Sequence, residues 1–306
     1  MNPIRLRLRS SIPRDYRRSL SRKSKKQQEQ GIPSNWLLPK IVILLQILII
    51  CSAFSLRVQD KMKEVLGYIR NRTNQAKQNP FILWLDDDSI SARDRLSLWL
   101  PHISAFVMGF MDLNKLIFPY PSSEAATDEL KRLINDHCLQ DGTHWEWYLR
   151  DLQKLELNRT MKFSEGLEFI YGDHRKLDRA FIYGIAALAH EAQDPLLRYS
   201  LIAPLEFFAH LLFGKTAPIA RKFAEETGIQ LEYVGDIHSG VEPGGLVNQQ
   251  HQIIDEDLFT EAVLDEQMRK RGLEMAEYMC DQIELRWKGN LEFAKKREWA
   301  TPIVVV

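Results

Sequence analysis

Two histidines and an aspartate lie close together in the segment His137-Cys-Leu-Gln-Asp-Gly-Thr-His144. In an α-helix, Asp141 would lie about 40° round from His137, and His144 would lie about 20° from it two turns further on. Imidazole and carboxylate groups are common ligands of transition metals. The spacing therefore indicates a metal site on one helix face. An internal hydrogen-bond network in this largely apolar segment is the alternative, because unpaired buried polar groups are costly.

Glu206 and His210 form a second pair, four residues apart, in Pro204-Leu-Glu-Phe-Phe-Ala-His-Leu-Leu-Phe213. Every other residue of this run is apolar, which predicts a helix buried on all sides with Glu206 in the interior. A buried glutamate must be paired or neutral. Glu206 is therefore expected either to pair with His210 or a core arginine, or to ligate a metal held by the first helix.

His238 and Glu242 are also four residues apart, and they form the weakest of the three pairs. Pro243 disfavours helical geometry at Glu242, and Gly240 disfavours a continuous helix across the pair.

The order of these three pairs resembles the iron-containing redox enzymes of the haem-oxygenase-like diiron oxidase superfamily, relatives of the thiaminase and pyrroloquinoline-quinone synthase folds. In that pattern a first helix gives ligands seven apart, a second gives a glutamate, and a third gives a histidine and an acid four residues on. The run His144-Trp-Glu-Trp-Tyr-Leu-Arg-Asp-Leu152 also looks like that family's signature. The resemblance covers roughly residues 60 to 290.

The resemblance implies an iron enzyme that uses O2 to oxidise a small organic substrate. It assigns His144, His238 and Glu206 to a mononuclear site, and His137 and Glu242 to a second iron position. Asp141 and His210 are expected not to bind the metal themselves but to orient the side chains that do. Trp145, Tyr148, Phe207 and Phe208 are expected to line an apolar pocket.

Two positions depart from the family pattern, because Gly245 stands where a last histidine is expected and Gln140 where close relatives have an acid. One iron, two irons and an inactive, metal-free family member therefore all remain open. No residue is assigned a catalytic role. The alternative function is a metal-free, membrane-tethered helical interaction module.

Beyond residue 57 the apolar residues follow a helical period almost throughout, which predicts an all-α, haem-oxygenase-like bundle of about seven to nine helices. One short strand is expected near 230–234. The expected helices are 57–76, 90–117, 124–156, 163–170, 174–192, 195–212, 215–227 and 256–297.

Three regions differ in charge. Residues 1–40 carry eleven Lys or Arg and two acids, which predicts a disordered basic arm. Residues 41–56 are uncharged and largely apolar, and the length of this segment is near the lower limit for a helix that spans a bilayer. Because the whole chain is neutral, the helical domain 57–306 has a net charge of −9, which argues against nucleic-acid binding.

The segment 41–56 has several interpretations. A membrane anchor would leave the basic arm in the cytoplasm. A cleaved signal peptide and a core helix are alternatives. If translation starts near Met62 instead, the domain is expected to be cytoplasmic.

The three cysteines, Cys51, Cys138 and Cys280, are widely separated and indicate neither a disulfide framework nor a zinc knuckle. A thiaminase-like hydrolase would need a nucleophilic cysteine in the pocket. Neither Cys138 nor Cys280 has a neighbouring base in the sequence, and Cys138 is expected to serve packing.

Overall fold

A computed structural model describes residues 61–239 and 256–297, all within the unit Leu56–Val306. Every regular element in these ranges is a helix, so the predicted all-α class is confirmed. The short strand expected near 230–234 does not form, because this segment is a series of bends. The described ranges hold more separate helices than the seven to nine expected, because short turns interrupt several of the longer predicted segments.

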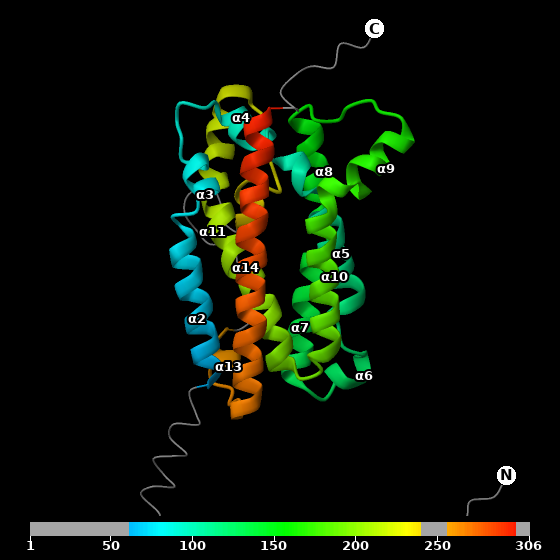
Figure 1. The fold of residues 1–306 in the computed structure, drawn as a ribbon, viewed down its shortest axis with the longest axis vertical. Coiled ribbons are helices and arrows are strands. Elements are labelled where there is room, and N and C mark those ends of the chain that lie inside the picture. The colour runs from blue at the N-terminus through cyan, green and yellow to red at the C-terminus, as the bar shows by residue number, and fades with distance from the viewer. Residues whose placement is uncertain (1–60, 240–255, 298–306) are drawn as a thin grey trace, which may run out of the picture. The chain divides into compact units, whose positions relative to one another are not determined.

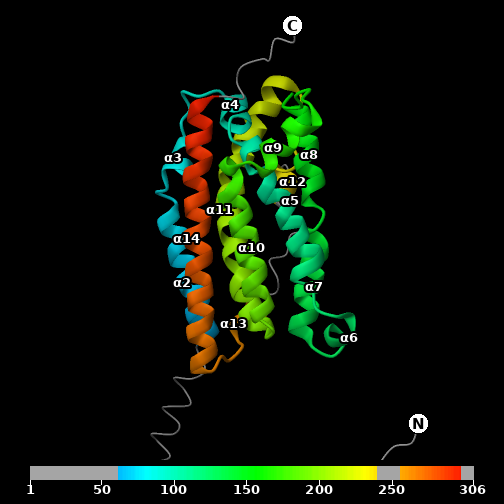
Figure 2. The same cartoon turned by 45° about the vertical axis from the view of Figure 1, so that its right-hand side comes forward.

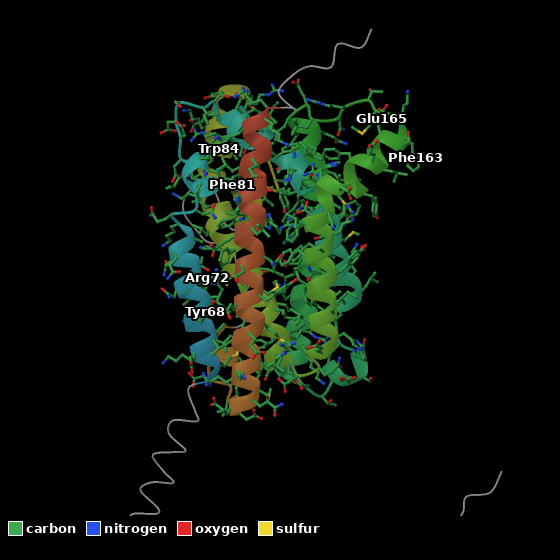
Figure 3. All side chains as sticks on the ribbon, in the orientation of Figure 1. Tyr68, Arg72, Phe81, Trp84, Phe163 and Glu165 are labelled. Carbon is green, nitrogen blue, oxygen red and sulfur yellow. The ribbon has the colours of Figure 1, made fainter. Side chains whose placement is uncertain are left out.

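Three long helices lie side by side: α2 (Lys61–Ala76), α11 (Pro195–Thr227) and α14 (Glu266–Lys296), as Figures 1 and 2 show. Arg72 on α2 connects two of them, because its guanidinium donates to Asp281 and Glu284 of α14 at 2.7 and 2.8 Å. It also donates to Tyr68 one turn earlier on α2, and Figure 3 shows these two side chains.

A second group of helices packs against the first: α5 (Ser104–Asp112), α7 (Glu129–Asp141), α8 (His144–Lys154) and α10 (Lys176–Glu191). Helix α10 packs against α5, α14 and α11, and α7 packs against α11. The remaining elements are short: α3 (Pro80–Leu85), α4 (Ala92–Ser97), η3 (Leu100–Ile103), η4 (Leu113–Ile117), α6 (Ser122–Ala125), α9 (Phe163–Tyr171), η5 (Asp173–Arg175), α12 (Asp236–Ser239) and α13 (Glu256–Thr260).

The segment 124–156 was expected to be one helix, and this prediction is wrong. The chain turns at Gly142 and Thr143, so that His137 and Asp141 end α7 while His144 begins α8. The amide of Gly142 donates to the carbonyl of Cys138 at 3.0 Å, and a Cβ on Gly142 would lie 3.0 Å from the same oxygen.

The opposite correction applies to 195–212 and 215–227, which form the single helix α11. Asp194 caps its start by accepting from the Leu196 amide at 2.8 Å, and Pro195 occupies the first turn. Gly214 does not end the helix, which stops at Gly228, where φ is +75°. Helix α14 begins only at Glu266, because residues 261–265 separate it from α13.

Two stretches are long and apolar enough to cross a membrane by length and composition, Ala92–Ile117 and Pro195–Thr227. More than half of each apolar window, 56% and 61%, is buried inside the bundle, as core helices of a soluble protein also are. The segment 41–56, the predicted anchor, lies outside the described residues.

Candidate metal centre and its cavity

The side chains of His137, Asp141 and Glu206 converge at the contact between α7 and α11. Nε2 of His137 lies 3.2 Å from Oδ2 of Asp141 and 3.4 Å from Oε1 of Glu206. One donor atom from each of the three residues lies within 4.8 Å of the others. An imidazole and two carboxylates so placed can chelate a metal ion.

The charges of this cluster interact strongly because they are shielded from water: His137 and Asp141 are only 7% and 5% exposed. Burial acts to lower the pKa of His137, but the carboxylates of Asp141 and Glu206 outweigh it and raise that pKa. Burial raises the pKa of Asp141, and Glu206 acts in the same direction. Two carboxylates held this close therefore favour a cation between them.

A second pair of imidazoles adjoins the cluster. Nδ1 of His144 lies 3.6 Å from Oδ1 of Asp141. The rings of His144 and His238 meet edge to face, with centroids 4.5 Å apart. Nδ1 of His238 lies 2.8 Å from the carbonyl oxygen of Tyr233, which can accept a hydrogen bond only from a protonated Nδ1.

Asp151 on α8 holds the segment that carries His238 into this region. Its side chain is fully buried and accepts three backbone N–H groups, from Glu232 at 2.7 Å, Tyr233 at 2.8 Å and Val234 at 3.1 Å. Asp151 therefore fixes the irregular backbone before α12, where regular helical hydrogen bonds are absent.

The cluster opens onto a cavity of about 440 Å³ lined mainly by apolar and aromatic side chains. The cavity reaches His137, Asp141, Glu206, His144 and His238. Helices α5, α10, α11 and α14 contribute aromatic side chains to this lining, among them Phe106, Phe110, Phe181, Phe208, Phe213 and Trp287.

The pocket prediction holds for two of its four residues, since Trp145 and Phe208 line the cavity. The other two face elsewhere. The hydroxyl of fully buried Tyr148 donates to the carbonyl of Leu100 at 3.0 Å. Phe207 lies under the guanidinium of Arg70 on α2. Both residues therefore pack the bundle rather than the cavity.

The structure also differs from expectation along α11. Glu206 was predicted to be interior, yet its side chain is 23% exposed because it borders the cavity. His210 lines the same cavity and is exposed, and Glu206 pairs with His137. Asp141 was expected to orient the metal ligands, but it contributes one of the three converging donor atoms itself. Glu242 lies outside the described residues.

The two described cysteines are buried, as predicted for Cys138. Burial raises the pKa of both thiols, that of Cys280 to about 12. A thiol so protonated is a poor nucleophile, which argues against thiaminase-like chemistry at either residue.

Sequence reasoning missed three polar residues of the cavity wall: Tyr233, Arg286 and Asn290. Arg286 and Asn290 are four residues apart on α14, a spacing that the sequence displays. Sequence analysis predicted a helix over this range but assigned neither residue to the cavity. Tyr233 lies in irregular backbone, where no periodic signal predicts its direction.

Compared with known proteins, the chain matches no family model and no curated protein.

Proposed function

We propose that this protein is a non-haem iron oxidoreductase that uses O2 to oxidise a small organic substrate bound in the cavity, on a haem-oxygenase-like bundle. The observation that carries the proposal is the convergence of His137, Asp141 and Glu206 at the wall of that cavity. Buried carboxylates are costly without a counter-charge, and a divalent cation supplies one.

The donor set is suited to iron. Imidazole nitrogen and carboxylate oxygen are the ligands of non-haem Fe(II) centres, and His137, Asp141 and Glu206 would hold the ion. Bound Fe(II) would supply the activation of O2. His144 lies beside Asp141 and His238 beside His144, so these rings can orient the carboxylate or add a nitrogen donor.

The rest of the cavity serves the substrate. Its aromatic lining excludes water from the reacting groups and buries an apolar substrate body. Asp151 acts as a positioning residue, because it holds the backbone that presents Tyr233 and His238.

A second candidate function is the metal-free, membrane-tethered interaction module. It is favoured by the fact that His137, Asp141 and Glu206 already satisfy one another as an internal ion-pair network. In that case the cluster stabilises the contact between α7 and α11, and no metal is needed.

Metal content separates the two functions. The full-length chain is produced in iron-supplemented medium and its metals are measured by inductively coupled plasma mass spectrometry, alongside Glu206→Gln and His137→Gln. We expect about one iron per chain, reduced at least tenfold in both variants. Fe(II)-dependent uptake of O2 should fall in parallel.

Matched controls are Glu284→Gln and His102→Gln. Glu284 is a half-buried glutamate that pairs with Arg72, and His102 is a largely buried histidine hydrogen-bonded to Asn290. Both controls should keep their iron. A protein without metal would favour the interaction module, and zinc alone would contradict the redox proposal.

A further inference from the structure

Helix α10 has one side that the described part of the chain leaves uncovered. Its inner side packs against α5, α14 and α11, and in Figures 1 and 2 no other described helix lies across most of its outward side. At 3.6 residues per turn, the exposed side chains of α10 fall within an arc of about 140°. This α10 face consists of Lys176, Leu177, Ala180, Tyr183, Ala187, His190 and Glu191.

The α10 face exposes large apolar side chains close together. Leu177 and Tyr183 are 57% and 65% exposed. Tyr171, at the end of α9, is 62% exposed and adjoins the face, because its ring centroid lies 5.6 Å from the guanidinium carbon of Arg179 on α10. Apolar side chains gathered on one exposed surface are typical of a protein–protein contact.

The middle of the α10 face is suited to a second helix. Ala180 and Ala187 are exposed and seven residues apart, so they lie on one line along α10 and leave room for another backbone. On the opposite side α10 lies tightly on α14, because a Cβ on Gly184 would lie 2.1 Å from the hydroxyl oxygen of Tyr278. The face is therefore presented by a helix that is firmly packed from behind.

The two ends of the α10 face carry opposite charges. Lys176 is the first residue of α10 and Glu191 is the last. Glu191 pairs with Arg271 of α14, which also pairs with Glu274, and the side chain of Glu191 is still 59% exposed. A cation at the start of a helix and an anion at its end are both disfavoured by the helix dipole. Each of these charges would therefore be stabilised by an opposite charge from outside.

A second copy of the same helix, lying antiparallel, supplies those charges. A two-fold axis that crosses α10 between Tyr183 and Gly184 brings Lys176 of one copy to Glu191 of the other, because both residues are equally far from the axis. The same axis sets Ala180 against Ala187. The two helix dipoles then also point in opposite directions, which is the favourable arrangement for neighbouring helices.

We propose that this chain forms a symmetric homodimer through its α10 faces, with Lys176 of each copy beside Glu191 of the other. None of the residues of the α10 face lines the cavity, so this inference is independent of the proposed function. Because a helix of 16 residues is only about 24 Å long, the contact lies at the small end of specific interfaces, and the dimer dissociates at micromolar concentration.

Zero-length cross-linking with a carbodiimide tests this arrangement in the full-length chain in mild detergent. The reagent joins a lysine amine directly to a carboxylate that touches it. Within one chain Lys176 and Glu191 stand at opposite ends of α10, about 22 Å apart, so an amide between them forms only between two copies. We expect the Lys176–Glu191 product, identified by mass spectrometry, to increase between about 1 and 100 µM protein. Lys131 and Glu124, 2.7 Å apart in one chain, should be linked at every concentration.

Charge reversal identifies the antiparallel pairing. Lys176→Glu alone and Glu191→Lys alone each place like charges at both ends of the contact, and each should weaken the dimer at least about tenfold in sedimentation equilibrium. An equimolar mixture of the two variants pairs an all-acidic copy with an all-basic one. This mixture should associate within about threefold of the unmodified chain.

Ala180→Glu places a charge in the middle of the contact and should abolish the dimer. The residue is exposed on a helix and glutamate is a good helix former, so circular dichroism should show an unchanged fold. Leu139→Glu is the matched control, because Leu139 is 77% exposed on α7 and lies outside the α10 face. This control should leave the dimer unchanged.

Three results would overturn the proposal. The first is linkage of Lys131 to Glu124 without any Lys176–Glu191 product, and the second is a mixture of the charge-reversed variants that associates no better than either variant alone. The third is association that persists in Ala180→Glu. A link from Lys176 to Glu242 or Asp255 in place of Glu191 would also contradict the dimer and would assign the α10 face to the segment 240–255.

Discussion

Replacement of Asp151 should destabilise the protein through the backbone groups that its carboxylate satisfies. Asp151 is 0% exposed and accepts the N–H groups of Glu232, Tyr233 and Val234. Burial raises the pKa of Asp151 in spite of these three bonds, so the ionised carboxylate gains little from its surroundings. The cost of removing it therefore comes mainly from the N–H groups left behind.

The magnitude follows from that count. Each orphaned buried N–H costs about 1–3 kcal/mol, and water entering the space left by Asp151→Ala recovers part of the sum. We expect Asp151→Ala to lower the free energy of unfolding by about 3–5 kcal/mol. In Asp151→Asn one oxygen remains for two N–H groups, while the new NH2 faces the third donor, so the expected loss is about 1–3 kcal/mol.

Urea unfolding of the full-length chain, followed by circular dichroism, measures both losses. Asp281→Asn is the control, since this carboxylate is 58% exposed and bonds Arg72 at the surface, where such pairs contribute about 0–1 kcal/mol. A loss below about 0.5 kcal/mol in Asp151→Ala would falsify the reasoning, because three buried N–H groups that lose their acceptor should destabilise the folded state by more than that.

Gly109→Ala should destabilise the protein by about 1–3 kcal/mol, because a Cβ there would lie 2.6 Å from the buried side chain of Ile182. Gly67→Ala meets nothing within 4 Å in helix α2 and should stabilise it by up to about 1 kcal/mol; thermal unfolding of both variants checks the pair, and equal effects would contradict the packing argument. For His102, the pKa is about 4 in the folded chain and 6.5 as the ordinary value, so the unfolded chain takes up the proton first as the pH falls. Stability should therefore decline between pH 6.5 and 4, by about 1–2 kcal/mol from pH 7 to pH 5, and His102→Gln should lack this component in urea titrations at the two pH values.

The local part of the structure could be read from the sequence. Helical periodicity predicted the all-α class, since apolar residues three and four apart face one core whatever that core contains. The closeness of His137 and Asp141 was likewise predictable, because residues four apart on a helix are neighbours before any tertiary contact forms. The predicted helix boundaries were wrong at two glycines. Gly142 ends α7, whereas Gly214 lies inside α11 without interrupting it.

Packing over long sequence distances decided the rest. Glu206 meets His137 only because α11 lies against α7, and no spacing within either segment encodes that contact. Arg286 and Tyr233 line one cavity because α14 and the segment held by Asp151 close over it. The sequence thus determined which side chains could do chemistry, while the tertiary structure decided which of them meet, because a cavity exists only where several separately formed elements pack together.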